Sequence, residues 1–184
     1  MSPSGEFRDQ LIAAIPGLRA FGMSLTARSD QADDLVQETL MKAWNHQDSF
    51  ENGTNLKAWL YTILRNEFYS QIRRRRREIE DANGEYAGKV AVTGGQESNL
   101  HMADLRMALA TLPEDQREAI ILVGASGFSY QEAAEISGTA IGTVKSRVSR
   151  AREKLSTILG TDTAGEAMGL TDLGPQERRA GTKA

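Results

Sequence analysis

Residues 129–155 read SYQEAAEISGTAIGTVKSRVSRAREKL, and this stretch decides the fold. Its first four residues, SYQE, fit the capping box that begins a helix, so a short helix is predicted over 130–137. Gly138 suits the left-handed turn that ends a helix, and a second helix is predicted over 140–155. Two helices joined by a tight glycine turn, the second of them basic, form the plan of a helix-turn-helix.

The second helix of this motif divides into an apolar stripe and a basic face. Its apolar residues recur at spacings of three and four, so they are expected to face a core: Ile141, Val144, Val148, Ala151 and Leu155. The rest of the helix is expected to present small and cationic side chains to phosphates and base edges: Gly142, Thr143, Lys145, Ser146, Arg147, Ser149, Arg150 and Lys154. The alternative is a solvated basic helix.

The chain around this motif divides into two helical modules. The stretch 77–99 lacks helical periodicity and contains glycines among acidic and small polar residues, which is typical of a linker. Residues 6–77 and 100–159 are therefore predicted to form two small all-α domains joined by a flexible linker over 78–99. The tail 160–184 is rich in glycine and poor in apolar residues, and it is predicted to be disordered.

Both modules show apolar residues at helical spacing. In the first, one helix is predicted before Pro16 and another from Pro16 onward, because proline is best placed at a helix start. A third helix, with Ser29 as its N-cap, has this apolar stripe: Ala32, Leu35, Val36, Thr39, Leu40, Ala43 and Trp44. In the second module, helices are predicted over 102–112 and from Pro113 to a break at Gly124 and Gly127.

The fourth helix begins near Leu56, and its stripe is expected to place Trp59 and Phe68 in the core. It ends in five consecutive arginines, 73–77. Outside the stripe it carries aromatic side chains interleaved with cations, a pattern that suits stacking on unpaired bases: Lys57, Tyr61, Arg65, Asn66, Tyr69 and Arg73. The alternative for the arginines is structural, since cations stabilise the negative end of a helix dipole.

Composition narrows the chemistry. The 184 residues include no Cys and two His, so we expect no metal site and no cofactor. No carboxylates are paired near a His or metal motif, and no glycine-rich phosphate loop follows a strand, so an enzyme is not expected. No apolar run could cross a bilayer and the N-terminus does not read as a signal peptide, so we expect a cytoplasmic protein without membrane contact.

Charge is unevenly distributed along the chain, whose formal net charge is −3. Residues 140–156 carry five basic side chains and one acidic side chain, whereas 101–139 carry two and six. Local basic faces on an acidic background indicate contact with a polyanion at chosen places. In the free protein, the acidic stretch 78–139 is expected to lie near the basic last helix and to weaken DNA binding.

Taken together, these features resemble the extracytoplasmic-function group of sigma factors, the two-domain initiation subunits of bacterial RNA polymerase. The matching residues occur in order on both sides of the linker and cover about 6–159. They are 32–40, 43–44, 58–60, 63–66, 112–113, 117–118, 129–134, 142–147 and 150–152. Further stretches are similar to the branch that directs the general stress response of alphaproteobacteria: PGLRAF at 16–21, GTNLKAWL at 53–60 and LVGASGFSY at 122–130.

The resemblance implies partners and roles. One face of the third helix would dock on the clamp helices of the largest polymerase subunit, through Asp33, Asp34, Gln37, Glu38, Met41 and Lys42. The polymerase flap would be a further contact of the protein. The loop 46–55 and the helix after it would open and hold the minus-ten element of promoter DNA, and the last helix would read the minus-thirty-five element. A small anti-sigma factor of the NepR type would hold the protein until a sigma-like response regulator removes it.

Other interpretations compete with this one. An exposed acidic face beside nucleic-acid surfaces needs a basic protein partner, although it could also be an ordinary solvated face. A sigma-like decoy that binds only an anti-sigma factor would not need the intact basic last helix. A stand-alone helix-turn-helix regulator would leave the first module without a role.

Overall fold

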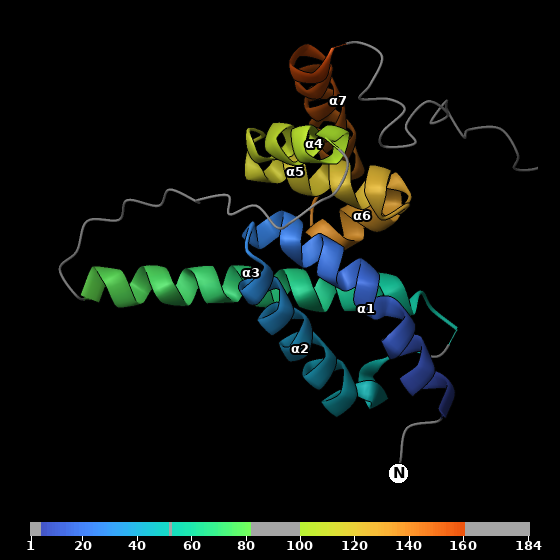
Figure 1. The fold of residues 1–184 in the computed structure, drawn as a ribbon. Coiled ribbons are helices and arrows are strands. Elements are labelled where there is room, and N and C mark those ends of the chain that lie inside the picture. Colours follow the sequence, from blue (N-terminus) through green and yellow to red (C-terminus); the bar gives the residue numbers. More distant parts are fainter. Residues whose placement is uncertain (1–4, 52, 82–99, 161–184) are drawn as a thin grey trace, which may run out of the picture.

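The computed structural model describes residues 5–51, 53–81 and 100–160, and within these ranges every regular element is helical, as predicted. Figure 1 shows α1, α2 and α3 in one module and α4 to α7 stacked against it. The helices in chain order are α1 (Gly5–Thr26), α2 (Ser29–Asn45), η1 (Gln47–Ser49), α3 (Leu56–Asp81), α4 (Leu100–Ala110), α5 (Glu114–Ile120), η2 (Ile121–Ala125), α6 (Tyr130–Ser137) and α7 (Ile141–Leu159). None of these described helices is long and apolar enough to cross a membrane.

The first module is built around a core shared by α1, α2 and α3. Leu18, Phe21 and Leu60 are each at most 1% exposed. A single helix, α1, replaces the two helices predicted on either side of Pro16, so that prediction is wrong. An internal proline removes a backbone hydrogen bond. The helix nevertheless continues, because Leu11 before the proline and Leu18 after it are buried in the same core.

The α2 helix follows its predicted stripe with two exceptions. Five of the seven stripe residues are buried: Ala32, Leu35, Val36, Thr39 and Ala43. Leu40 is half-buried and Trp44 is 41% exposed, so the prediction that Trp44 faces the core is wrong. The N-cap position belongs to Arg28, which makes no side-chain cap, and Ser29 is the first helical residue rather than the cap.

The second module contains the predicted helix-turn-helix. Both hydrogen bonds of the capping box are present, because Glu132 N donates to Ser129 Oγ and Ser129 N donates to the Glu132 carboxylate. Gly138 ends α6 in the left-handed conformation, with φ 62° and ψ 35°. Ahead of the motif, α5 passes into the π-helical turn η2, which runs through Gly124, so the predicted break at that glycine is wrong. The helix ends before Gly127, the other predicted break, where φ is 73°. The core of this module includes Leu122, Ile136, Val144 and Leu155.

The two modules pack against each other. α3 packs against α6, and α1 packs against α5. Tyr61 of α3 stacks on Phe21 and meets Phe128 of the second module edge-on, with ring centroids 4.9 Å apart in both pairs. α3 extends to Asp81, so four residues of the predicted linker are helical; the rest of it, 82–99, and the tail 161–184 lie outside the described residues.

Candidate nucleic-acid and protein-binding surfaces

The exposed side of α7 carries most of the residues predicted to meet duplex DNA. Val144 and Val148 are buried on the opposite side and fix the orientation of the helix. Five members of the predicted set are exposed: Gly142, Lys145, Ser149, Arg150 and Lys154. Thr143 and Ser146 are half-buried, and Ser146 Oγ donates to the Thr143 carbonyl at 2.9 Å. The helix therefore presents three long cations and two small residues to solvent.

Arg147 differs from the other predicted DNA-contacting cations. Its guanidinium pairs with Asp115 of α5 at 3.0 Å, and its side chain is 23% exposed. This contact holds α7 against α5 within the second module. The structure therefore gives Arg147 a role in positioning the helix rather than a free place on its exposed face.

The six residues of α3 predicted to hold the minus-ten element fall on two sides of the helix. Asn66 and Arg73 line a hollow between α2, η1 and α3. The other four, Lys57, Tyr61, Arg65 and Tyr69, all contact residues of the second module. The prediction that Tyr61 lies on an exposed face is wrong for this conformation, since its side chain is 2% exposed between two aromatic rings.

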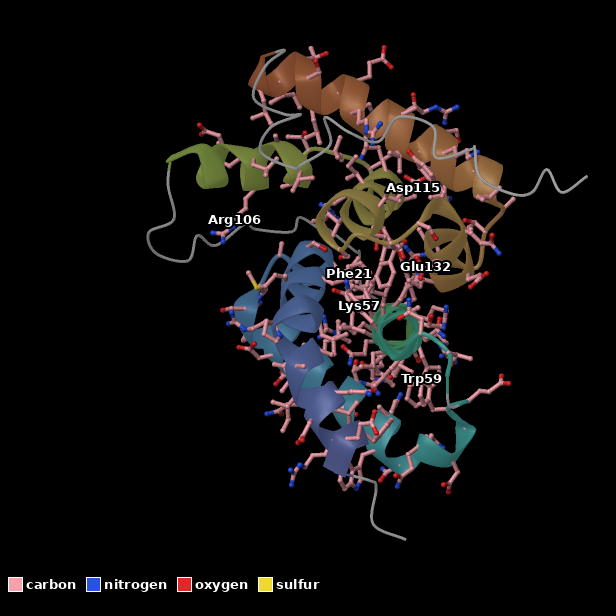
Figure 2. All side chains as sticks on the ribbon, turned by 90° about the vertical axis from the view of Figure 1, so that its right-hand side faces the viewer. Phe21, Lys57, Trp59, Arg106, Asp115 and Glu132 are labelled. Carbon is pink, nitrogen blue, oxygen red and sulfur yellow. The ribbon has the colours of Figure 1, made fainter. Side chains whose placement is uncertain are left out.

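Two polar side chains at the start of α3 fasten one edge of the interface. The Lys57 ammonium donates to the carbonyl oxygen of Ser126 at 2.5 Å and lies 4.8 Å from the centroid of the Phe128 ring. Asn55 donates to the Glu132 carboxylate at 2.6 Å. Figure 2 shows Lys57 and Glu132 at the junction of the two modules. The hydrogen bond from the Ser129 backbone, followed by smaller ones, lowers the pKa of Glu132.

A buried carboxylate fastens the interface further along α3. The Arg65 guanidinium pairs with Glu118 of α5, and the side chains are 19% and 3% exposed. The Tyr69 hydroxyl donates to the second oxygen of the same carboxylate at 3.2 Å. Burial, reinforced by the negative charge of Glu118, raises the pKa of Tyr69, so its hydroxyl stays protonated as a donor. Among the described residues of the acidic stretch, Glu118 and Glu132 thus meet α3, and Asp115 pairs with Arg147 of the basic last helix.

The hollow beside α3 combines an apolar wall with polar edges. It encloses about 520 Å³ and is lined by Lys42, His46, Ser49, Trp59, Ile63, Asn66, Glu67, Ser70 and Arg73. Trp59 is half-buried rather than fully in the core, and its ring lies 5.3 Å from that of Phe50. From Arg73 at the edge of the hollow, the arginines 73–77 continue along α3, all exposed, toward the part of the helix that projects past the other helices (Figure 1).

The predicted acidic face of α2 is exposed, but two of its members are paired within the module. Asp33 accepts from Arg19 at 2.6 Å, and this hydrogen bond lowers the pKa of Asp33. Lys42 pairs with Glu67 of α3, which turns the ammonium group toward the hollow and lowers the pKa of Glu67. The other four are all exposed: Asp34, Gln37, Glu38 and Met41.

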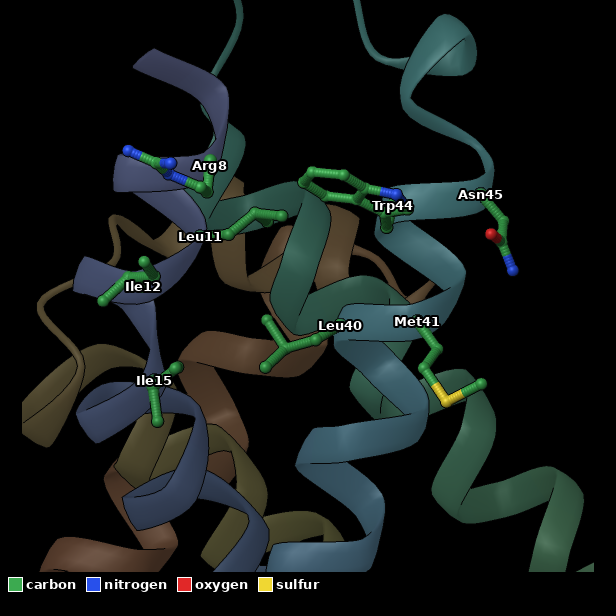
Figure 3. A pocket seen from close by; sticks show the side chains of 8 residues that line it. All are labelled: Arg8, Leu11, Ile12, Ile15, Leu40, Met41, Trp44 and Asn45. Carbon is green, nitrogen blue, oxygen red and sulfur yellow. The ribbon is translucent and has the colours of Figure 1, made fainter. Parts of the chain in front are cut away.

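An apolar groove between α1 and α2 adjoins this face (Figure 3). It encloses about 480 Å³ and is lined by Arg8, Leu11, Ile12, Ile15, Leu40, Met41, Trp44 and Asn45. Ile12, Met41 and Trp44 are 56%, 60% and 41% exposed, and a group of exposed apolar side chains marks an interaction surface more often than a single one does. Of these, only Met41 was predicted as a binding residue. The sequence contains one signal for this groove. Leu11 and Ile12 are adjacent on a helix, so their side chains cannot both face the same core, and one of them is expected on the surface.

The sequence did not predict the interface role of several residues that fasten the modules: Asn55, Glu118, Ser126, Phe128 and Glu132. Their partners lie between 49 and 77 residues away in the chain. Local periodicity carries no signal for such contacts. In the described part of the chain, no cluster of His, Asp and Glu is arranged to hold a metal ion.

Comparison with known proteins matches each of the two modules to a region of sigma-70 factors. The family model for sigma-70 region 2 matches residues 11–78, and the model for sigma-70 region 4 matches residues 102–155. The ECF RNA polymerase sigma factor EcfG of Rhodopseudomonas palustris is 54% identical over 96% of this chain and 94% of that protein. The RNA polymerase sigma factor CnrH of Cupriavidus metallidurans is 31% identical over 82% of this chain and 83% of that protein.

Two solved structures are similar to most of this chain, across both modules. The sigma factor RpoE of Bartonella quintana, crystallised with the anti-sigma factor NepR, is 58% identical with a TM-score of 0.76, covering 85% of this chain and 98% of that one. CnrH in complex with the cytosolic domain of CnrY is 28% identical with a TM-score of 0.62, covering 85% of this chain and 88% of that one.

Proposed function

The chain belongs to the extracytoplasmic-function group of the sigma-70 family of RNA polymerase sigma factors, and we propose that it directs polymerase to promoters of the general stress response through the surfaces described above. In this proposal, residues 6–77 serve as region 2 and 100–159 as region 4. The chain acts in the cytoplasm as an initiation factor, and the polymerase supplies the catalysis.

The observation that carries the proposal is the exposed basic side of α7. A helix-turn-helix places its second helix in the major groove, where cations meet phosphates and guanine edges. Arg150 and Lys145 are exposed on this side, and the small residues Gly142 and Ser149 allow close approach. We assign Arg150 to a base contact in the minus-thirty-five element and Lys154, one turn further, to a phosphate. A decoy that binds only an anti-sigma factor would have no use for this surface.

The hollow between α2, η1 and α3 suits an unpaired base of the minus-ten element. Trp59 and Ile63 offer an apolar wall for the face of a base, while Asn66 can bond to its edge. Arg73, at the rim, supplies a cation for the adjoining phosphate. Asn66→Ala should reduce promoter opening, measured with 2-aminopurine at successive minus-ten positions, whereas Gln10→Ala on the outer side of α1 should not. Equal opening by both variants would count against this assignment.

We assign the exposed acidic residues Asp34 and Glu38, together with Met41, to the clamp helices of the polymerase largest subunit, and region 4 to its flap. A small anti-sigma factor like the NepR that binds the Bartonella sigma factor would compete for the same face and for the neighbouring apolar groove. A sigma-like response regulator would release it; the anti-anti-sigma factor PhyR of Bartonella quintana forms a complex with NepR.

Nucleic acid can use the side of α3 that faces the second module only when the two modules separate. In the described conformation, the second module binds the polar groups of Lys57, Arg65 and Tyr69 through hydrogen bonds and an ion pair. Nucleic acid can therefore reach these groups only after the interface opens. We propose that binding to core polymerase opens this interface, because the polymerase would hold the two modules at two separate promoter elements. The free chain is therefore a poor promoter binder.

Transcription in vitro tests the proposed function. The chain and core polymerase together should start transcripts at a stress-response promoter that neither uses alone. Arg150→Ala should lower this activity, whereas Thr157→Ala, an exposed position on the same helix, should keep it. The proposal fails if the chain adds no promoter-specific initiation, or if both variants retain full activity.

A further inference from the structure

Ile141 occupies a position that its sequence pattern does not explain. The spacing of apolar residues along α7 predicts that Ile141 shares a core stripe with Val144, Val148 and Leu155. Those three are each 1% exposed, whereas Ile141 is 43% exposed. The core prediction is therefore wrong for Ile141, and a large apolar side chain stands in solvent at the first residue of α7.

Geometry along the helix explains the exposure. Residues at i, i+4 and i+8 follow one another along a helix surface, so Ile141 stands in line with Lys145 and Ser149. Both of these are exposed members of the set that we assign to the minus-thirty-five element. Ile141 thus lies at the margin of the DNA-facing side of α7, one turn before its first cation.

The space around the start of α7 is open. A Cβ atom added at the neighbouring Gly142 would meet no other heavy atom within 4 Å, so no part of the described chain covers this point. In a helix-turn-helix, the N-terminal residues of the second helix are the ones that reach base edges in the major groove. Ile141 is placed where such a residue would be.

The major groove of DNA presents one apolar group that such a side chain can contact. Thymine carries a C5-methyl group on its major-groove edge, and apolar side chains recognise thymine through it. Lys145, one turn beyond Ile141 and exposed, and Arg150 further along the exposed side of α7 favour a polyanion over an apolar protein surface. Building on the proposed function, we propose that Ile141 contacts the C5-methyl group of a thymine in the minus-thirty-five element and contributes to the choice of promoter.

Replacement of thymine by deoxyuridine tests this proposal, because it removes only the methyl group. Each thymine of the minus-thirty-five element is replaced in turn, and promoter binding is measured with polymerase holoenzyme containing the wild-type chain or Ile141→Ala. At one position the wild type should lose about fourfold in affinity, as for one buried methyl group. Ile141→Ala should bind the thymine promoter with a similar loss and should show no further loss with deoxyuridine.

The matched control is Ile158→Ala, which removes another exposed isoleucine from the far end of α7, where the side chain is 51% exposed. This variant should respond to deoxyuridine as the wild type does. The proposal is overturned if Ile141→Ala keeps the full deoxyuridine effect at every position, or if it weakens only binding to an anti-sigma factor. A wild-type holoenzyme that does not use the promoter would instead overturn the proposed function.

Discussion

Replacing Glu118 by glutamine should open the interface between the two modules. The side chain of Glu118 is 3% exposed, and its carboxylate accepts from both Arg65 and Tyr69 of α3. Glutamine keeps the shape of the side chain but removes its charge and one of the two acceptor oxygens. Arg65 is hydrated again when the modules separate. The substitution should therefore mainly weaken the association of the two modules, with much less effect on the stability of either module alone.

The magnitude follows from the chemistry of the lost contacts. Hydrogen bonds to charged groups contribute about 1.5–3 kcal/mol, and removing one partner of a buried ion pair can cost about 3–5 kcal/mol. Taking the lower range, because the substituted side chain could still accept one hydrogen bond, the open population should rise roughly 10- to 150-fold. Direct DNA binding by the free chain should rise in the same proportion while closed molecules predominate.

Fluorescence energy transfer between the modules measures this directly. The chain contains no cysteine, so dyes can be attached at Asp48→Cys in the first module and Thr157→Cys in the second. Glu118→Gln should broaden and lower the transfer efficiency. Asp115→Asn, which breaks a pair inside the second module, should leave it unchanged. If the two variants show the same transfer as the parent, Glu118 does not hold the modules together.

Four further outcomes are expected. Reversing Asp34 and Glu38 to Lys should weaken binding to core polymerase, measured by titration, without a change in helical content; unchanged affinity would mean that this face is merely solvated. Arg150→Ala should cost about 1–3 kcal/mol in promoter binding and relax the preference at one minus-thirty-five base pair, seen by comparing promoter variants. Ser129→Ala should lower the free energy of unfolding by about 1 kcal/mol in urea titrations. Since the pKa of Glu132 is lowered in the fold, its contribution should be complete above the ordinary Glu pKa and should fall as the pH drops below it.

The parts of the fold that could be predicted are those set by local signals. The capping box at Ser129 and the left-handed turn at Gly138 act over a few residues, and both are present where the sequence predicts them. Periodicity located most of the core of α2 and α7 for the same reason. Pro16 shows the limit, because its local preference for a helix start is outweighed by burial of apolar residues on both sides of it.

The parts that could not be predicted depend on which surface another element covers. Tyr61 and Trp44 illustrate this in opposite directions. Tyr61 lies outside the apolar stripe of α3 and was expected on an exposed face, yet the second module buries it. Trp44 lies on the stripe of α2, yet the helix ends beside an open groove and nothing within the described chain fully covers it. Periodicity assigns a residue to a side of a helix but does not say what meets that side.

The same side chains that close the two modules are among those that we assign to promoter DNA, and this overlap has a thermodynamic consequence. Arg65 and Tyr69 cannot bond to Glu118 and to DNA at once, so closure and promoter binding exclude each other at this surface. A partner that binds only the open form raises the DNA affinity by the factor with which it depletes the closed form. Core polymerase would act in this direction. An anti-sigma factor that prefers the closed form would act in the other, and it could block initiation without touching any base-reading residue of α7.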